Sequence, residues 1–150
     1  MRIYTLLILL GLTACATKFK HADILTIDTH IDIPVSLGQG DADPRVDGPM
    51  QVDLPKIRKG GLDAGFFIVY VKQAGVSEAG YKQAYEEAQK KFAAIELMLQ
   101  NSSDKLVLVR NPSQLKQAVS AGKLAVAIGV ENAYPLGSRL ENLEEFYERG

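Results

Sequence analysis

The chain has 150 residues, which allows one domain of ordinary size and not two large ones. Its 47% hydrophobic and 23% charged residues are typical of a globular protein, and its formal net charge of -1 provides no basic patch for a nucleic-acid partner. One cysteine excludes a disulfide framework and a CxxC metal site, and two histidines cannot form a three-histidine zinc site.

The first residues have the pattern of a targeting signal. Arg2 supplies a positive charge, and the apolar run from Ile3 to Leu12 is too short for a transmembrane helix, which needs about 20 residues. The sequence LTAC at 12–15 resembles the lipobox of bacterial lipoproteins, in which the cysteine becomes the lipidated first residue of the mature chain. The alternative is an ordinary signal peptide in which Cys15 is incidental.

We therefore expect a lipoprotein signal peptide at 1–14, a membrane anchor through lipidated Cys15, a tether at 15–23 and a folded domain at 24–150. Such an address implies the bacterial cell envelope, with the domain facing the periplasm. Ala16 rather than Asp follows the cysteine, which favours the outer membrane.

The rest of the chain alternates between two hydrophobic periodicities. Apolar and β-branched runs predict buried strands at 24–27, 64–71, 106–109 and 124–130. Amphipathic patterns with capping residues predict helices at 54–59, 77–100, 112–121 and 140–149. This alternation is typical of a parallel α/β sheet. The strands are too few for a closed eight-stranded barrel of about 250 residues, so the domain is either a small open α/β fold or the first part of a larger one.

Two tyrosines on the longest predicted helix allow two interpretations. Tyr81 and Tyr85 could stack on a ligand, but they lie on the helix's apolar stripe. That spacing favours a helix that packs on a sheet, with the tyrosines as packing residues.

Polar side chains follow two of the predicted strands. Asp28, His30 and Asp32 alternate with Thr29 and apolar residues, so an extended segment would point all three to one side. Glu131 directly follows the apolar run at 124–130 and is expected at the same edge of a parallel sheet. An imidazole and carboxylates that converge in this way can bind zinc.

Structural interpretations of these residues stay open at this point. The two aspartates and His30 could cap a turn through Asx-type hydrogen bonds, and Glu131 could cap the following helix. An HxD pair alone is a common short pattern.

Three separated segments together resemble the membrane (renal) dipeptidase family of zinc peptidases. They are IDTHIDIP at 27–34, QVDLPKIRKGG at 51–61 with its following apolar strand, and IGVEN at 128–132. The middle segment carries no obvious chemistry, so convergence on a metal site does not explain its match. The resemblance covers nearly all of the mature chain.

The resemblance implies a fold and a ligand set. The fold is a metal-dependent-hydrolase-type (β/α)8 TIM barrel, of which this chain would be the incomplete N-terminal part. His30 and Asp32 would ligate one of two zinc ions, and Glu131, the expected catalytic residue, would bridge both. Asp28 would not bind zinc itself but would contact the ligands and help to orient them. Since such enzymes are often dimers, the resemblance also allows a homodimer.

The implied reaction is hydrolysis of the amide bond of a dipeptide. Two zinc ions on one bridging carboxylate lower the pKa of a shared water, which gives a metal-bridging hydroxide that attacks the amide carbon. Zinc suits imidazole and carboxylate ligands, although manganese or cobalt could substitute. Some relatives also open β-lactam rings.

The sequence departs from the family in one major respect. The second zinc ion and the substrate need further histidines, but none follows His30, and His21 receives no role. We therefore expect a fragment that is inactive alone. Two other functions stay open: another metal-dependent amidohydrolase, such as a deacetylase, and a non-catalytic envelope lipoprotein. The segment Asn132–Pro135 receives no assignment.

Overall fold

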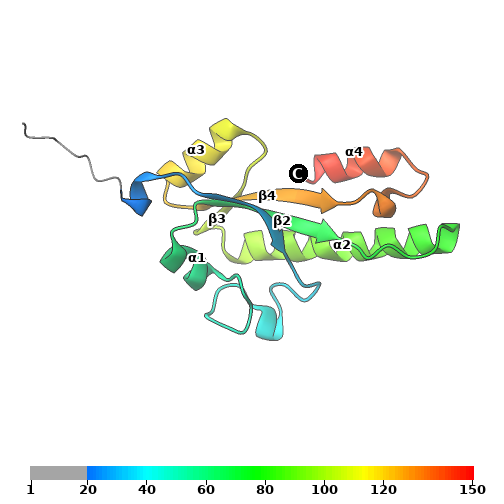
Figure 1. The fold of residues 1–150 in the computed structure, drawn as a ribbon, viewed down its shortest axis with the longest axis horizontal. Coiled ribbons are helices and arrows are strands. Elements are labelled where there is room, and N and C mark those ends of the chain that lie inside the picture. Colours follow the sequence, from blue (N-terminus) through cyan, green and yellow to red (C-terminus); the bar gives the residue numbers. More distant parts are fainter. Residues whose placement is uncertain (1–19) are drawn as a thin grey trace, which may run out of the picture.

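The computed structural model describes residues 20–150, in which four parallel strands form one sheet in the order β1-β2-β4-β3 (Figure 1). The strands are β1 (Ile27–Asp32), β2 (Ala64–Tyr70), β3 (Leu106–Leu108) and β4 (Leu124–Glu131). The helices are α1 (Leu54–Gly60), α2 (Glu78–Asn101), α3 (Pro112–Ser120) and α4 (Glu141–Glu148). Single 3-10 turns lie at η1 (His21–Asp23), η2 (Gly40–Ala42) and η3 (Tyr134–Leu136). The predicted parallel α/β sheet is confirmed.

Capping side chains explain where the helices begin and end. Asp53 accepts the backbone N–H of Lys56 at the start of α1, and Ser77 accepts that of Gly80 at the start of α2. These bonds satisfy backbone donors that the first helical turn leaves free. Gly61 ends α1 in the left-handed conformation (φ 69°), which glycine adopts without a steric penalty.

Helix α2 covers one face of the sheet (Figure 1). Its buried stripe packs on strand residues in the main hydrophobic core, and the central members of the stripe are Ala84, Ala88, Phe92, Ile95 and Met98. The two tyrosines of this helix contact other aromatic rings, since Tyr81 packs on Tyr134 and Tyr85 stacks on Phe146 of α4. These contacts favour the packing interpretation of the pair.

The opposite face of the sheet is covered only in part by the described residues. Helix α3 packs there on alanines near the beginnings of β2 and β4. Phe66 is 37% exposed on this face, and Leu25 and Ile27 are exposed beside it. The apolar run at 64–71 predicts a strand buried on both faces, but within residues 20–150 the face opposite α2 is covered only in part.

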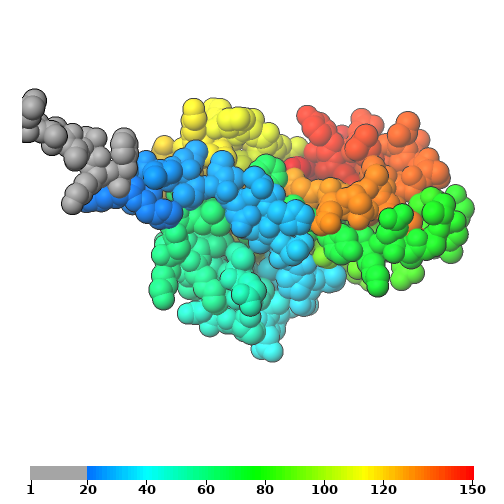
Figure 2. All heavy atoms as spheres, in the orientation of Figure 1, coloured from blue at the N-terminus to red at the C-terminus, as the bar shows by residue number. Residues whose placement is uncertain are grey.

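The first strand also differs from its prediction. The apolar run at 24–27 precedes β1 except for Ile27, and its isoleucines and Leu25 are exposed rather than buried. The reason is that this segment lies on the sheet face that the described residues cover only in part, whereas Ile31, on the face beneath α2, is buried. Strand β1 is an edge strand and lies across the surface of the molecule in blue in Figure 2.

The N-terminal predictions fall largely outside the described residues. The signal peptide at 1–14, the lipidation site Cys15 and the first part of the tether all lie there. At the end of the tether, His21 Nε2 donates a hydrogen bond to the carbonyl of Gly60 (2.9 Å), which links η1 to the end of α1. Among residues 20–150, no helix is long and apolar enough to span a bilayer.

Candidate metal centre

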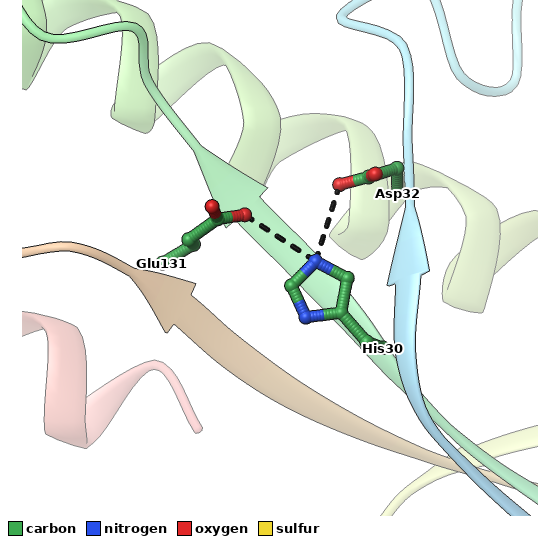
Figure 3. Close-up of side chains that lie close together, drawn as sticks. All are labelled: His30, Asp32 and Glu131. Atoms are coloured by element: carbon green, nitrogen blue, oxygen red, sulfur yellow. Dashed lines mark ion pairs between the residues drawn. The ribbon is translucent and has the colours of Figure 1, made fainter.

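The parallel sheet brings the ends of two strands together across a third. Strands β1 and β4 lie on either side of β2, with Asp32 level with Ile68 and Glu131 level with Tyr70. Because all three strands run in the same direction, their carboxyl ends share one edge. His30 and Asp32 from β1 and Glu131 from β4 converge there (Figure 3).

The register explains which face carries the cluster. Ile31 pairs with Phe67, and both lie in the core beneath α2. Successive residues of a strand point to opposite sides, so Asp32 and its neighbour Ile68 face away from α2. Tyr70 lies two residues after Ile68, and its partner Glu131 therefore points to the same side.

Asp28 does not join this cluster. It pairs with Gly65 and Ile31 pairs with Phe67, so two residues of β1 oppose one of β2 in a β-bulge. A bulge interrupts the alternation of sides, and the expectation that Asp28 shares a face with His30 and Asp32 is therefore wrong. Instead, Asp28 Oδ1 accepts the backbone N–H of His30 (2.9 Å) and holds the main chain at the bulge.

The two distances from His30 match the spacing of ligands around a zinc ion. His30 Nε2 lies 3.5 Å from Asp32 Oδ1 and 3.3 Å from Glu131 Oε2, and the three ligand atoms lie within 4.8 Å of one another. Two ligands at about 2.0–2.1 Å from a tetrahedral zinc are about 3.3 Å apart. Imidazole nitrogen and carboxylate oxygen are both ligand types that zinc takes in proteins. The residues present therefore fit the metal.

The cluster is open to solvent. The side chains of His30, Asp32 and Glu131 are 51%, 75% and 43% exposed. Three protein ligands leave a coordination position for water or substrate, as in catalytic rather than structural zinc sites. An open position at an exposed edge allows a substrate to reach the metal.

Two residues that lie next to the ends of β1 and β4 receive no role from the sequence. Lys91 of α2 is buried, and its Nζ donates a hydrogen bond to the carbonyl of Ile33, directly after β1 (3.0 Å). Asn132 follows Glu131 and has a positive φ of 63°. A lysine within an amphipathic helix gives no sign of burial, whereas an asparagine directly after a strand is a residue type that tolerates positive φ.

Comparison with known proteins identifies the family. The profile of the membrane dipeptidase family (peptidase family M19) matches residues 17–150. A dipeptidase of Aspergillus oryzae, aclJ, is 31% identical over 106 residues, which cover 67% of this chain and 25% of that protein.

Solved structures show the same fold. The probable dipeptidase PvdM from Pseudomonas aeruginosa is 24% identical with a TM-score of 0.81, over 87% of this chain and 34% of that one. A metallopeptidase from Rhodobacter sphaeroides, liganded with a phosphinate mimic of the dipeptide L-Ala-D-Ala, is 19% identical with a TM-score of 0.67, over 85% of this chain and 43% of that one. The chain thus spans between a quarter and less than half the length of these relatives, and the expected partial barrel is confirmed. By the family profile, the chain belongs to the membrane dipeptidases of peptidase family M19.

Proposed function

We propose that this chain provides part of the active site of a zinc-dependent dipeptidase. His30 and Asp32 would hold one zinc ion, and Glu131 would be a ligand both of that ion and of a second one. The observation that carries the proposal is the convergence of these three side chains, from two strands, at separations that suit zinc. The family of the chain and the dipeptide mimic bound to the Rhodobacter enzyme support the substrate class.

Each residue has a distinct task in this proposal. His30 and Asp32 supply neighbouring ligands from one strand, while Glu131 reaches the same point from the other side of β2. Asp28 holds the backbone of His30 through its 2.9 Å hydrogen bond. When bound, zinc lowers the pKa of a water and polarises the amide carbonyl. Because the side chains of the three ligands are partly exposed, a substrate can approach them from solvent.

We further propose that the 150 residues alone do not hydrolyse dipeptides. The cluster supplies ligands for one zinc ion and one bridge, and the sequence contains no histidine after His30 that could complete a second position. The anchor at Cys15, the outer-membrane location and a homodimer also belong to this proposal. They follow from the lipobox-like sequence and the family resemblance.

Zinc titration of the purified chain tests the bridging ligand. We expect Glu131→Gln to weaken zinc binding by more than about 100-fold, because an amide oxygen lacks the charge that a metal ligand supplies. Zinc affinity would be measured by competition with a chromophoric chelator. Glu144→Gln, which changes an exposed glutamate of α4, is the matched control and should leave affinity unchanged. Equal affinity of wild type and Glu131→Gln would contradict the proposed ligand set.

A further inference from the structure

Asn132, the residue after Glu131, has an unusual backbone conformation. Its φ is 63°, and within residues 20–150 every other residue with positive φ is a glycine. A side chain in this region is strained, although asparagine tolerates it better than most residues. Such a conformation persists only where the surroundings hold it.

Both polar atoms of the Asn132 side chain make hydrogen bonds. Nδ2 donates to the carbonyl of Val71 (3.1 Å), the residue that follows β2, and Oδ1 accepts the backbone N–H of Tyr134 (2.9 Å). Val71 is buried, so its carbonyl lies on a rigid part of the fold. The side chain of Asn132 therefore links the residue after β4 to the residue after β2 by a hydrogen bond.

Tyr134 provides a second set of contacts that hold the same turn. Its hydroxyl donates to the carbonyl of Gly75 (2.8 Å), and its ring packs on Tyr81 with centroids 5.3 Å apart. Gly75 lies in the connection between β2 and α2, and Tyr81 lies in the first turns of α2. The turn after β4 is thus held by the segment that follows β2.

The position of this turn bears on Glu131. A glutamate at the end of a strand is flexible, and its partly exposed carboxylate must reach His30 Nε2, 3.3 Å away. A fixed backbone at Asn132 sets the direction in which the Glu131 side chain leaves the strand. Less conformational freedom then remains to be lost when a metal binds.

We propose that Asn132 is a positioning residue. It orients the Glu131 carboxylate toward the position at which the side chains of His30 and Asp32 also converge. This inference rests on the proposed function, since it requires Glu131 to be a metal ligand. Asn132 itself does not contact the metal. It acts through its bonds to Val71 and Tyr134 and through the left-handed turn that they hold.

Zinc binding by the full chain tests the proposal with two substitutions. Asn132→Gly removes both side-chain hydrogen bonds but adopts positive φ freely, and we expect it to weaken zinc binding by about 10-fold, as residues that support metal ligands typically do. Asn132→Ala removes the same bonds and also disfavours the turn, so we expect at least as large a loss. Cobalt(II) serves as a second probe, because its visible absorption reports the ligand geometry. We expect its spectrum to change in both variants.

Asn142→Ala is the matched control. Asn142 also donates one hydrogen bond from Nδ2 to a backbone carbonyl, that of Leu136 (3.1 Å), in the same β4–α4 connection. Its side-chain hydrogen bond goes to Leu136 and not to Val71 or Tyr134, so zinc affinity should stay within about two-fold of wild type and the cobalt spectrum should not change. Wild-type affinity and spectrum in Asn132→Gly, or an equal loss in Asn142→Ala, would overturn the proposal.

Two further results separate this proposal from the proposed function. If Glu131→Gln abolishes zinc binding but Asn132→Gly does not weaken it, the ligand set stands and the positioning role falls. Amide exchange in zinc-free protein tests the turn without any metal, even if wild type binds no zinc. The Tyr134 N–H, which donates to Asn132 Oδ1, should exchange faster in Asn132→Gly, and unchanged exchange would overturn the proposal.

Discussion

Single side chains decide two properties of the molecule. One is the chemistry at the edge of the sheet, and the other is the stability of the segment that leads into α1. At the edge, one nitrogen of His30 faces oxygens of both Asp32 and Glu131. A single N–H can point to only one of these oxygens, whereas a metal ion contacts all three ligand atoms. The donor set is therefore better satisfied by a cation than by a proton.

Asp53 shows a different use of a carboxylate. Its side chain is buried, which by itself would raise the pKa of its carboxyl, but hydrogen bonds from the side chain and backbone of Lys56 and from the backbone of Gly48 outweigh burial. The pKa of Asp53 therefore lies below its usual value of 3.8. The charged form is favoured in the folded state, so its contribution to stability is present above that value and is lost as the pH falls through the folded pKa.

We expect Asp53→Ala to lower the free energy of unfolding by about 1–2 kcal/mol at pH 7, because the cap of α1 and the ion pair are both lost. The difference from wild type should shrink below pH 3.8, because the Asp53 carboxyl takes up a proton in the unfolded chain at a higher pH than in the folded protein. Urea unfolding at pH 7 and pH 3 measures both values. Asp47→Ala removes an exposed partner of the same lysine and should cost less than about 1 kcal/mol. A difference for Asp53→Ala that does not change with pH would contradict this explanation.

Helices and strands differed in how well the sequence predicted them. Helix bounds depend on local chemistry, and Asp53, Ser77 and Gly61 cap helices close to the bounds that the sequence predicts, 54–59 and 77–100. Strand burial depends on what covers each face, which a run such as 24–27 does not reveal. The bulge in β1 was also unpredictable, because it depends on how Asp28 and Ile31 pair with another strand. The convergence of His30, Asp32 and Glu131 was predictable, because the carboxyl ends of parallel strands lie at the same edge of a sheet.

The two faces of the sheet give a test at the scale of elements. Phe92 of α2 is fully buried and contacts Phe146, whereas Phe66 of β2 is 37% exposed on the opposite face. We expect Phe92→Ala to cost about 3–5 kcal/mol of unfolding free energy, as is typical for a large core side chain. Phe66→Ala should cost much less, about 1 kcal/mol, since its ring buries less area on folding. Equal losses in urea unfolding would show that the second face is covered in solution.

At the scale of the whole molecule, the described residues form one covered face, one partly open face and one edge that carries the ligands. Helix α2 gives the sheet a core, and α4 adds to it through the contact of Phe146 with Phe92. The cluster of His30, Asp32 and Glu131 lies on the opposite side of the sheet from α2, at the edge of the face that carries the exposed Phe66. The chain corresponds to 34% of the length of the PvdM structure, and the cluster likewise accounts for only part of the proposed two-zinc site.

The central claim is that His30, Asp32 and Glu131 bind one ion together. Anomalous diffraction at the zinc absorption edge, from crystals of the zinc-loaded chain, tests it most directly. We expect one strong peak at about 2.0–2.2 Å from His30 Nε2 and from a carboxylate oxygen of each acidic residue. A bound zinc that lies elsewhere, or that leaves Glu131 outside coordinating distance, would contradict the claim.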